Sequence, residues 1–138
     1  MAAVIIGTLE VPAMAREVRN VRRWLRDVLP SEYRALADDI VLLGVELVTN
    51  ALRHSDSAVL DSAGHPGRIT VAVLTQRQAL RVTVSDAGSS CGVPRMIDRG
   101  PGAETGRGLR MLDVLTGGRW GVSGDQRGRT VWFEVSLP

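Results

Sequence analysis

Lysine is absent from this chain of 138 residues, and aromatic residues are scarce. All 17 basic side chains are arginine, against 15 acidic ones, which gives a formal net charge of +2. A nucleic-acid binder of this size usually carries a denser basic stripe with interleaved aromatics, whereas three Trp, one Tyr and one Phe are present. The composition therefore argues against direct binding of nucleic acid.

Cysteine, histidine and long apolar runs are also scarce. The single Cys91 excludes an internal disulfide, and two histidines argue against a zinc site. Apolar runs such as Ile40 to Val45 are far shorter than the roughly 18 residues of a membrane-spanning helix. The N-terminal segment lacks the basic residues that open a secretory signal. We therefore expect a cytoplasmic protein without membrane attachment, folded as a single domain over residues 1–138.

The first half of the chain predicts one strand and two helices. Residues 2–11 alternate loosely, as in a strand, and Pro12 stands where a helix can begin. Apolar residues then recur at helical spacing until Pro30 ends the helix. Ser31 is the expected N-cap of a second helix that runs to about His54. Residues 55–66 are rich in Ser, Asp and Gly and are predicted to form a loop.

The second half changes to a period of two. Residues 69–73 and 80–84 predict an antiparallel hairpin across the turn Gln76-Arg77-Gln78. A glycine-rich stretch from Gly88 to Gly106 follows, of the kind that often forms a functional lid. A short helix, Leu109 to Leu115, and strands at about 119–123 and 129–137 complete an α+β fold. Its helices are expected on one face of a mostly antiparallel sheet.

The segment Glu46-Leu-Val-Thr-Asn50 places two polar side chains beside the apolar stripe of the second predicted helix. Glu46 and Asn50 are four residues apart, so both project from one side of that helix. A carboxylate at the edge of a core needs a partner or a function. Spacing alone favours a structural explanation, a salt bridge from Glu46 to Arg53.

Two further segments interrupt the structural pattern. Asp86 continues the inward-facing row of Leu80, Val82 and Val84, and its carboxylate should accept a hydrogen bond from a buried donor. The amino group of a ligand and a backbone N–H are equally compatible donors. The segment Glu104-Thr-Gly106-Arg107-Gly108-Leu109 is a glycine-rich turn ahead of a helix, where N–H groups attract phosphate.

In this order, the three segments resemble the N box and the two glycine-containing boxes of the GHKL ATPase superfamily, which includes gyrase B, sensor histidine kinases and MutL. The chain is more similar to the small branch of anti-sigma-factor serine kinases and related ATP-binding regulators of actinomycetes. The resemblance extends to Arg119-Trp120-Gly121 and to the end, Gly128-Arg-Thr-Val-Trp-Phe-Glu134. It implies a Bergerat ATP-binding fold, a two-layer α/β sandwich with a mixed, mostly antiparallel sheet and helices on one face.

The resemblance also implies roles for individual residues. Asn50 would complete the coordination of Mg²⁺ on the ATP phosphates, and Glu46 would be the general base. Asp86 would accept a hydrogen bond from the adenine amino group. The other residues implied in cofactor binding are Arg53, near a phosphate; Gly88, against the base; Gly106, Arg107, Gly108 and Leu109, around the phosphates; and Thr130, near the adenine.

Residues 89–105 would form the ATP lid, and the sequence departs from the family pattern in two places. Asp86-Ala-Gly88-Ser-Ser90 lacks the second glycine of the family's Asp-x-Gly-x-Gly, which affects the hinge of the lid more than adenine binding. In the last strand, Arg129 shares the apolar parity of Val131, whereas Thr130 faces the other way. Thr130 therefore reaches adenine only if a bulge resets the register.

The resemblance implies an Mg-ATP-binding anti-sigma factor with serine/threonine kinase activity. It would sequester a sigma factor and phosphorylate a small anti-anti-sigma (STAS-type) partner. Arginines of the first helix, including Arg16, Arg19 and Arg23, suit an acidic partner, although a solvated basic face explains them as well. The apolar first strand and the family's habit of pairing predict a homodimer.

Two other functions remain open. One is a non-catalytic binding module in which ATP only orders the lid. The other is the detached catalytic domain of a two-component kinase, against which the missing phosphoacceptor helix argues.

Overall fold

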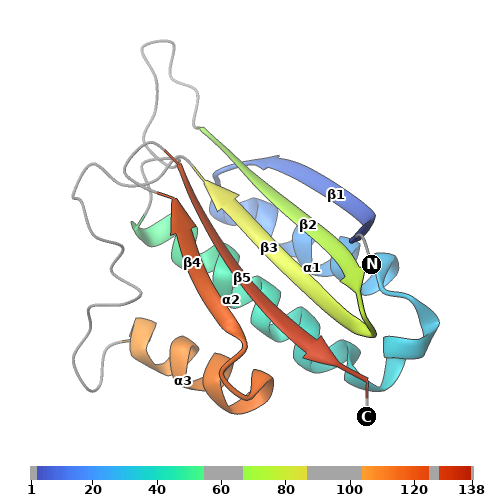
Figure 1. Cartoon of the computed structure of the whole chain (residues 1–138). Helices are drawn as coiled ribbons and strands as arrows, with labels where there is room; N and C mark the ends of the chain where they lie inside the picture. Colours follow the sequence, from blue (N-terminus) through green and yellow to red (C-terminus); the bar gives the residue numbers. More distant parts are fainter. Residues whose placement is uncertain (1–2, 55–66, 87–103, 125–127, 138) are drawn as a thin grey trace.

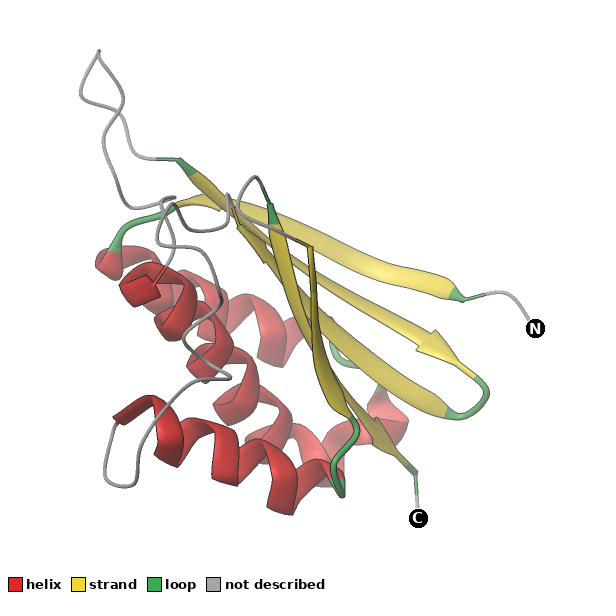
Figure 2. Ribbon diagram, turned by 60° about the vertical axis from the view of Figure 1, so that its left-hand side comes forward, coloured by secondary structure: helices red, strands yellow, loops and turns green. Residues whose placement is uncertain are grey.

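In the computed structural model, a five-stranded sheet carries its helices on one face (Figures 1 and 2). The structure describes residues 3–54, 67–86, 104–124 and 128–137, without the side chains of His54 and of residues 104–109. The described elements are β1 (Val4–Pro12), the 3₁₀ helix η1 (Ala15–Glu17), α1 (Val18–Val28), the 3₁₀ helix η2 (Ser31–Leu36), α2 (Ala37–His54), β2 (Arg68–Gln76), β3 (Ala79–Asp86), α3 (Glu104–Thr116), β4 (Trp120–Gly124) and β5 (Arg129–Ser136). This arrangement confirms the predicted α+β, two-layer fold.

The strands lie in the order β1-β2-β3-β5-β4. Each neighbouring pair is antiparallel, which confirms the mostly antiparallel sheet. The predicted hairpin is formed by β2 and β3, and its turn residues Arg77 and Gln78 have φ angles of 52° and 67°. Left-handed conformations at both positions suit the right-handed twist of a tight hairpin.

The core lies between the sheet and the helical layer. Alternate residues of the three central strands point inward, so that one face of the sheet is apolar and the other faces solvent. The inward strand residues that form the core are Ile69, Val71, Val73, Leu80, Val82, Val84, Val131, Phe133 and Val135. They pack against α1 and α2 through Val21, Leu25, Ile40, Leu43 and Leu47, among others. This inward parity is the framework that positions Asp86.

The first predicted helix begins later than the sequence pattern indicates. Pro12 ends β1, where it pairs with Arg68, and α1 starts only at Val18. Because β1 is an edge strand, a residue without an N–H is tolerated there. The burial of Val11 against β2 holds the chain extended up to that point.

The predicted first residues of the second and third helices are also wrong. Ser31 is not an N-cap: it is the first residue of η2, which has no side-chain cap and opens with a hydrogen bond from Tyr33 N to Pro30 O of 2.9 Å. The regular helix α2 starts at Ala37. α3 starts at Glu104 instead of Leu109, because its first turn precedes the apolar residues that the periodicity detects. None of the described helices has the length and apolarity needed to cross a membrane.

Candidate functional site

The three segments singled out in the sequence lie on neighbouring elements. Asn50 is in the C-terminal part of α2, Asp86 is the last residue of β3, and residues 106–109 lie near the start of α3. α2 contacts β3, β5 and α3, so it connects all three (Figure 1). The structure therefore groups these segments around α2.

Asn50 is a buried polar residue in the otherwise apolar layer. Its side chain is on the face of α2 that packs inward, and the residue is 2% exposed. Among the described residues, its Nδ2 has no hydrogen-bond acceptor. An unsatisfied buried amide costs about 1–3 kcal/mol, so its retention at this position calls for a ligand or another function.

Glu46 lies one turn before Asn50 and is half-buried. The ion pairs between described residues do not include Glu46, so the salt bridge to Arg53 that spacing favours is not formed. Arg53 itself is exposed at the end of α2. A salt bridge to Arg53 therefore does not explain Glu46, and a functional role of this carboxylate gains support.

Asp86 points inward as its strand parity predicts. Its side chain is 2% exposed, and its Oδ2 lies 3.7 Å from Nη2 of Arg129, whose side chain is 3% exposed. Sequence reasoning considered a ligand or a backbone N–H as the buried partner and missed this arginine. The strand parity of Arg129 predicts an inward side chain, but only the pairing of β3 with β5 shows that it faces Asp86.

Thr130 lies on the opposite face of the sheet. Its Oγ1 is 2.9 Å from Oγ of Ser85, its neighbour on β3. The register between β3 and β5 is continuous from Ala79–Ser136 to Asp86–Arg129, so the bulge that would turn Thr130 inward is not present. The geometry gives no support to a contact between Thr130 and adenine.

Several predicted residues cannot be placed. Gly88 and most of the predicted lid, residues 89–103, lie outside the described residues. The last two predicted lid residues, Glu104 and Thr105, belong to α3 instead. Gly106, Arg107, Gly108 and Leu109 are helical, since α3 starts before them; of their side chains the structure describes nothing.

η1 and the start of α1 carry a second candidate surface. A groove of ≈ 580 Å³ is lined by Arg16, Arg19 and Arg22, together with Ala15, Val18 and Asn20. Arg26, further along the helix, is paired with Asp38 at 2.9 Å. Arg16 lies 3.9 Å from a carboxylate oxygen of Glu17, so Arg19 and Arg22 contribute most of the positive charge of the groove, which suits an acidic ligand or protein surface.

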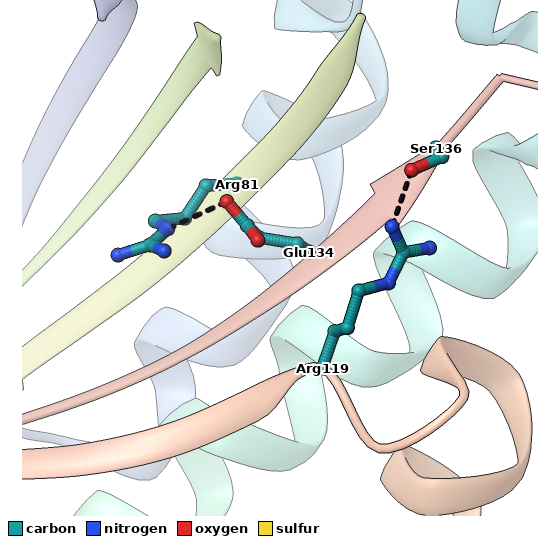
Figure 3. A network of polar contacts seen from close by, with 4 residues as sticks. All are labelled: Arg81, Arg119, Glu134 and Ser136. Atoms are coloured by element: carbon teal, nitrogen blue, oxygen red, sulfur yellow. Dashed lines mark hydrogen bonds and ion pairs between the residues drawn. The ribbon is translucent and has the colours of Figure 1, made fainter. Parts of the chain in front are cut away.

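The solvent-facing side of the sheet holds a polar network of a different kind (Figure 3). Arg81 Nε donates to Oε2 of Glu134 at 3.1 Å, and its guanidinium lies 4.0 Å from the ring centroid of Trp132. Arg119 donates to Oγ of Ser136. These contacts join β3 and β5 to the start of β4, and they lie on the face away from Asp86.

In a comparison with known protein families, the model of the histidine kinase-like ATPase domain matches residues 11–133. The matched span runs from the end of β1 to Phe133 in β5, and it includes Glu46, Asn50 and Asp86. None of the curated proteins matches the chain.

Proposed function

Since the chain belongs to the histidine kinase-like ATPase domain family and is thereby an ATP-binding regulatory domain, we propose that it is an anti-sigma factor with serine/threonine kinase activity. In this proposal it sequesters a sigma factor and transfers the γ-phosphoryl group of ATP to a STAS-type anti-anti-sigma partner. The observation that carries the proposal is the buried pair of polar residues, Asn50 on α2 and Asp86 on β3, within an apolar layer.

The residues present fit a magnesium-bound nucleotide. Asn50 is 2% exposed, and its side-chain amide oxygen is a hard ligand of the kind that Mg²⁺ prefers. Mg²⁺ favours one or two protein oxygens together with substrate phosphates and water, so a single amide is an adequate contribution. When bound, the ion neutralises charge on the phosphates; Asn50 is the residue that would hold it.

Glu46 is the proposed general base. It lies on the same side of α2 as Asn50, one turn away, and lacks an ion-pair partner among the described residues. A carboxylate in that position would accept the proton of a serine or threonine hydroxyl as the hydroxyl oxygen attacks the γ-phosphorus, while the bond from that phosphorus to the bridging oxygen breaks and ADP leaves. Arg53, one turn further on, is proposed to contact a phosphate. The backbone N–H groups in the first turn of α3, which include those of Gly106 and Arg107, are proposed to do the same.

The proposed partner interface is the basic groove of α1. Three of its lining residues are arginines. An acidic surface of a sigma factor or of the anti-anti-sigma protein would complement it. The second proposed interface is between two copies of the chain, along the edge strand β1.

The experiment that tests the proposal combines nucleotide binding with phosphoryl transfer. The chain is purified with its co-purifying partners and given Mg·ATP, and phosphorylated serines and threonines are identified by mass spectrometry. We expect one phosphosite on a small partner and its loss in Asn50→Ala. The control is Asp39→Ala, at an exposed position in the first turn of α2. ATP binding without phosphorylation of any co-purified protein would favour the non-catalytic binding module.

A further inference from the structure

The inward face of the sheet carries a buried ion pair where β3 ends and β5 begins. Asp86 and Arg129 are direct cross-strand partners, and their side chains are 2% and 3% exposed. The following inward residues of β5, Val131 and Phe133, are apolar. An arginine at the head of this row is therefore a departure from the pattern, at the place where the candidate nucleotide site lies.

Packing alone gives no reason for this arginine. Buried ion pairs are often no more stabilising than apolar residues of similar volume, because both charges lose their water. An arginine of that burial is rare unless it is paired. This buried ion pair is therefore better explained by a binding role of the carboxylate than by a contribution to the stability of the fold.

The guanidinium of Arg129 lies directly against the carboxylate of Asp86. The separation of 3.7 Å between Nη2 and Oδ2 is within the range of an ion pair and longer than the roughly 2.7–3.2 Å of an N–H···O hydrogen bond. The positive charge at this distance offsets part of the cost of burying the carboxylate. A hydrogen bond from a ligand to a carboxylate in such an apolar surrounding is strong.

We propose that Arg129 is a positioning residue for nucleotide recognition: it holds the Asp86 carboxylate buried and oriented to accept a hydrogen bond from the exocyclic amino group of a 6-aminopurine nucleotide. The inference rests on the proposed function of the site. Arg129 acts through Asp86, so it governs the preference for the amino group more than the affinity for the triphosphate.

The solvent-facing side of the same two strands provides a matched control. Arg81 on β3 pairs with Glu134 on β5 at 3.1 Å, and their side chains are 33% and 20% exposed (Figure 3). Arg81→Met removes an arginine–carboxylate pair between the same strands, on the face away from the site. It therefore reports the effect of weakening the β3–β5 pairing alone.

The test measures calorimetrically the affinity for Mg·ATP and for the Mg-bound triphosphate of purine riboside, which lacks the amino group. We expect wild type to prefer ATP by roughly 10–100-fold, the usual magnitude for one hydrogen bond to a charged acceptor. In Arg129→Met this preference should fall to about one, Arg129→Lys should recover most of it, and Arg81→Met should retain it. A role in folding alone would leave the ratio unchanged in every variant that folds.

Several results would overturn the inference. A folded Arg129→Met that keeps the full preference, or that binds ATP more tightly than wild type, would show that the arginine does not position Asp86. Equal affinity of wild type for both nucleotides would show that Asp86 does not bind the amino group of the base, although the protein binds ATP. Wild type that binds neither would overturn the proposed function itself. If Arg129→Met does not fold, Arg129→Gln is measured in its place, and a retained preference there has the same meaning.

Discussion

The carboxylate of Asp86 and the guanidinium of Arg129 face each other across neighbouring antiparallel strands, 3.7 Å apart and almost fully buried. Their position at one end of the sheet, beside α2, links the strand framework to the buried Asn50. In the proposed site, the sheet orients Asp86, which accepts a hydrogen bond from the nucleotide base, and α2 provides the residues near the phosphates.

The first prediction concerns Asp86. Asp86→Ala removes a buried acceptor, and Mg·ATP affinity should fall by about 1–3 kcal/mol. Isothermal titration calorimetry gives the affinity, and circular dichroism checks that the variant is folded, because Arg129 loses its charged partner. Asp39→Ala, at an exposed position of the first turn of α2, is the control. Unchanged affinity in folded Asp86→Ala would remove this residue from the site.

The second prediction concerns Glu46. Glu46→Gln keeps the size of the side chain and removes the proton acceptor, so turnover should fall by roughly 10²–10⁴-fold while ATP affinity and folding persist. The rate is measured with a competent acceptor protein, since a serine kinase can hydrolyse ATP poorly by itself. Glu32→Gln, exposed in η2, serves as control. Near wild-type phosphorylation by Glu46→Gln would end the catalytic assignment.

Period and parity in the sequence were sufficient to predict much of this arrangement. The inward direction of Asp86 and Arg129, and the outward one of Thr130, follow from a period of two along each strand. Their pairing does not follow, because the contact depends on β5 lying beside β3, a neighbour relation between strands separated by more than forty residues. Long-range strand order is set by packing of the whole sheet and leaves no local signal.

The helix starts show a different limit. Apolar periodicity detects the buried face of a helix. It therefore predicts the presence of α1, α2 and α3, but it locates the first residue of each helix poorly. Pro12 and Ser31 are both residues that often open helices, and here a strand edge and a 3₁₀ turn take those positions. The absent ion pair between Glu46 and Arg53 is similar: spacing shows which side chains share a face, not which of them meet.

The third prediction is a pH dependence that arises from Tyr33. Burial, with a smaller contribution from the Glu32 carboxylate, raises the pKa of Tyr33 above its ordinary value of 10.0. The unfolded chain therefore loses this proton first, and the free energy of unfolding should fall as pH rises past about 10. Below that pH, both states keep the proton and the effect disappears.

Tyr33→Phe tests this effect by urea denaturation near neutral pH and near pH 11. The variant loses the hydrogen bond to the carbonyl of Gln78, 3.1 Å long, so it should be less stable by about 0.5–1.5 kcal/mol at neutral pH. Its stability should then decline less than that of wild type in alkali. Because the chain has one tyrosine and no lysine, an equal decline in both proteins would contradict the assignment.

The fourth prediction concerns the contact of α1 with α2. A Cβ at Gly44 would lie 2.6 Å from Cδ1 of Leu25, which is fully buried. Gly44→Ala should therefore lower the free energy of unfolding by about 1–3 kcal/mol, despite the better helix propensity of alanine. In a Leu25→Ala background the clash is removed, and the same change should be neutral or stabilising. Equal costs in both backgrounds, measured by chemical denaturation, would contradict the packing argument.

The last prediction is that two copies of the chain associate along β1. This strand is at the edge of the sheet, and Val4 and Ile5 are 58% and 66% exposed there. An exposed apolar edge strand can pair with its own copy across a two-fold axis, which extends the sheet and covers these side chains. Light scattering should then give about twice the chain mass of 14.9 kDa at high concentration. Ile5→Lys places a like charge on both sides of the axis and should return the mass to that of one chain, whereas Val114→Lys, at an exposed position of α3, should not. A wild-type mass of 14.9 kDa at every concentration would show that β1 does not pair.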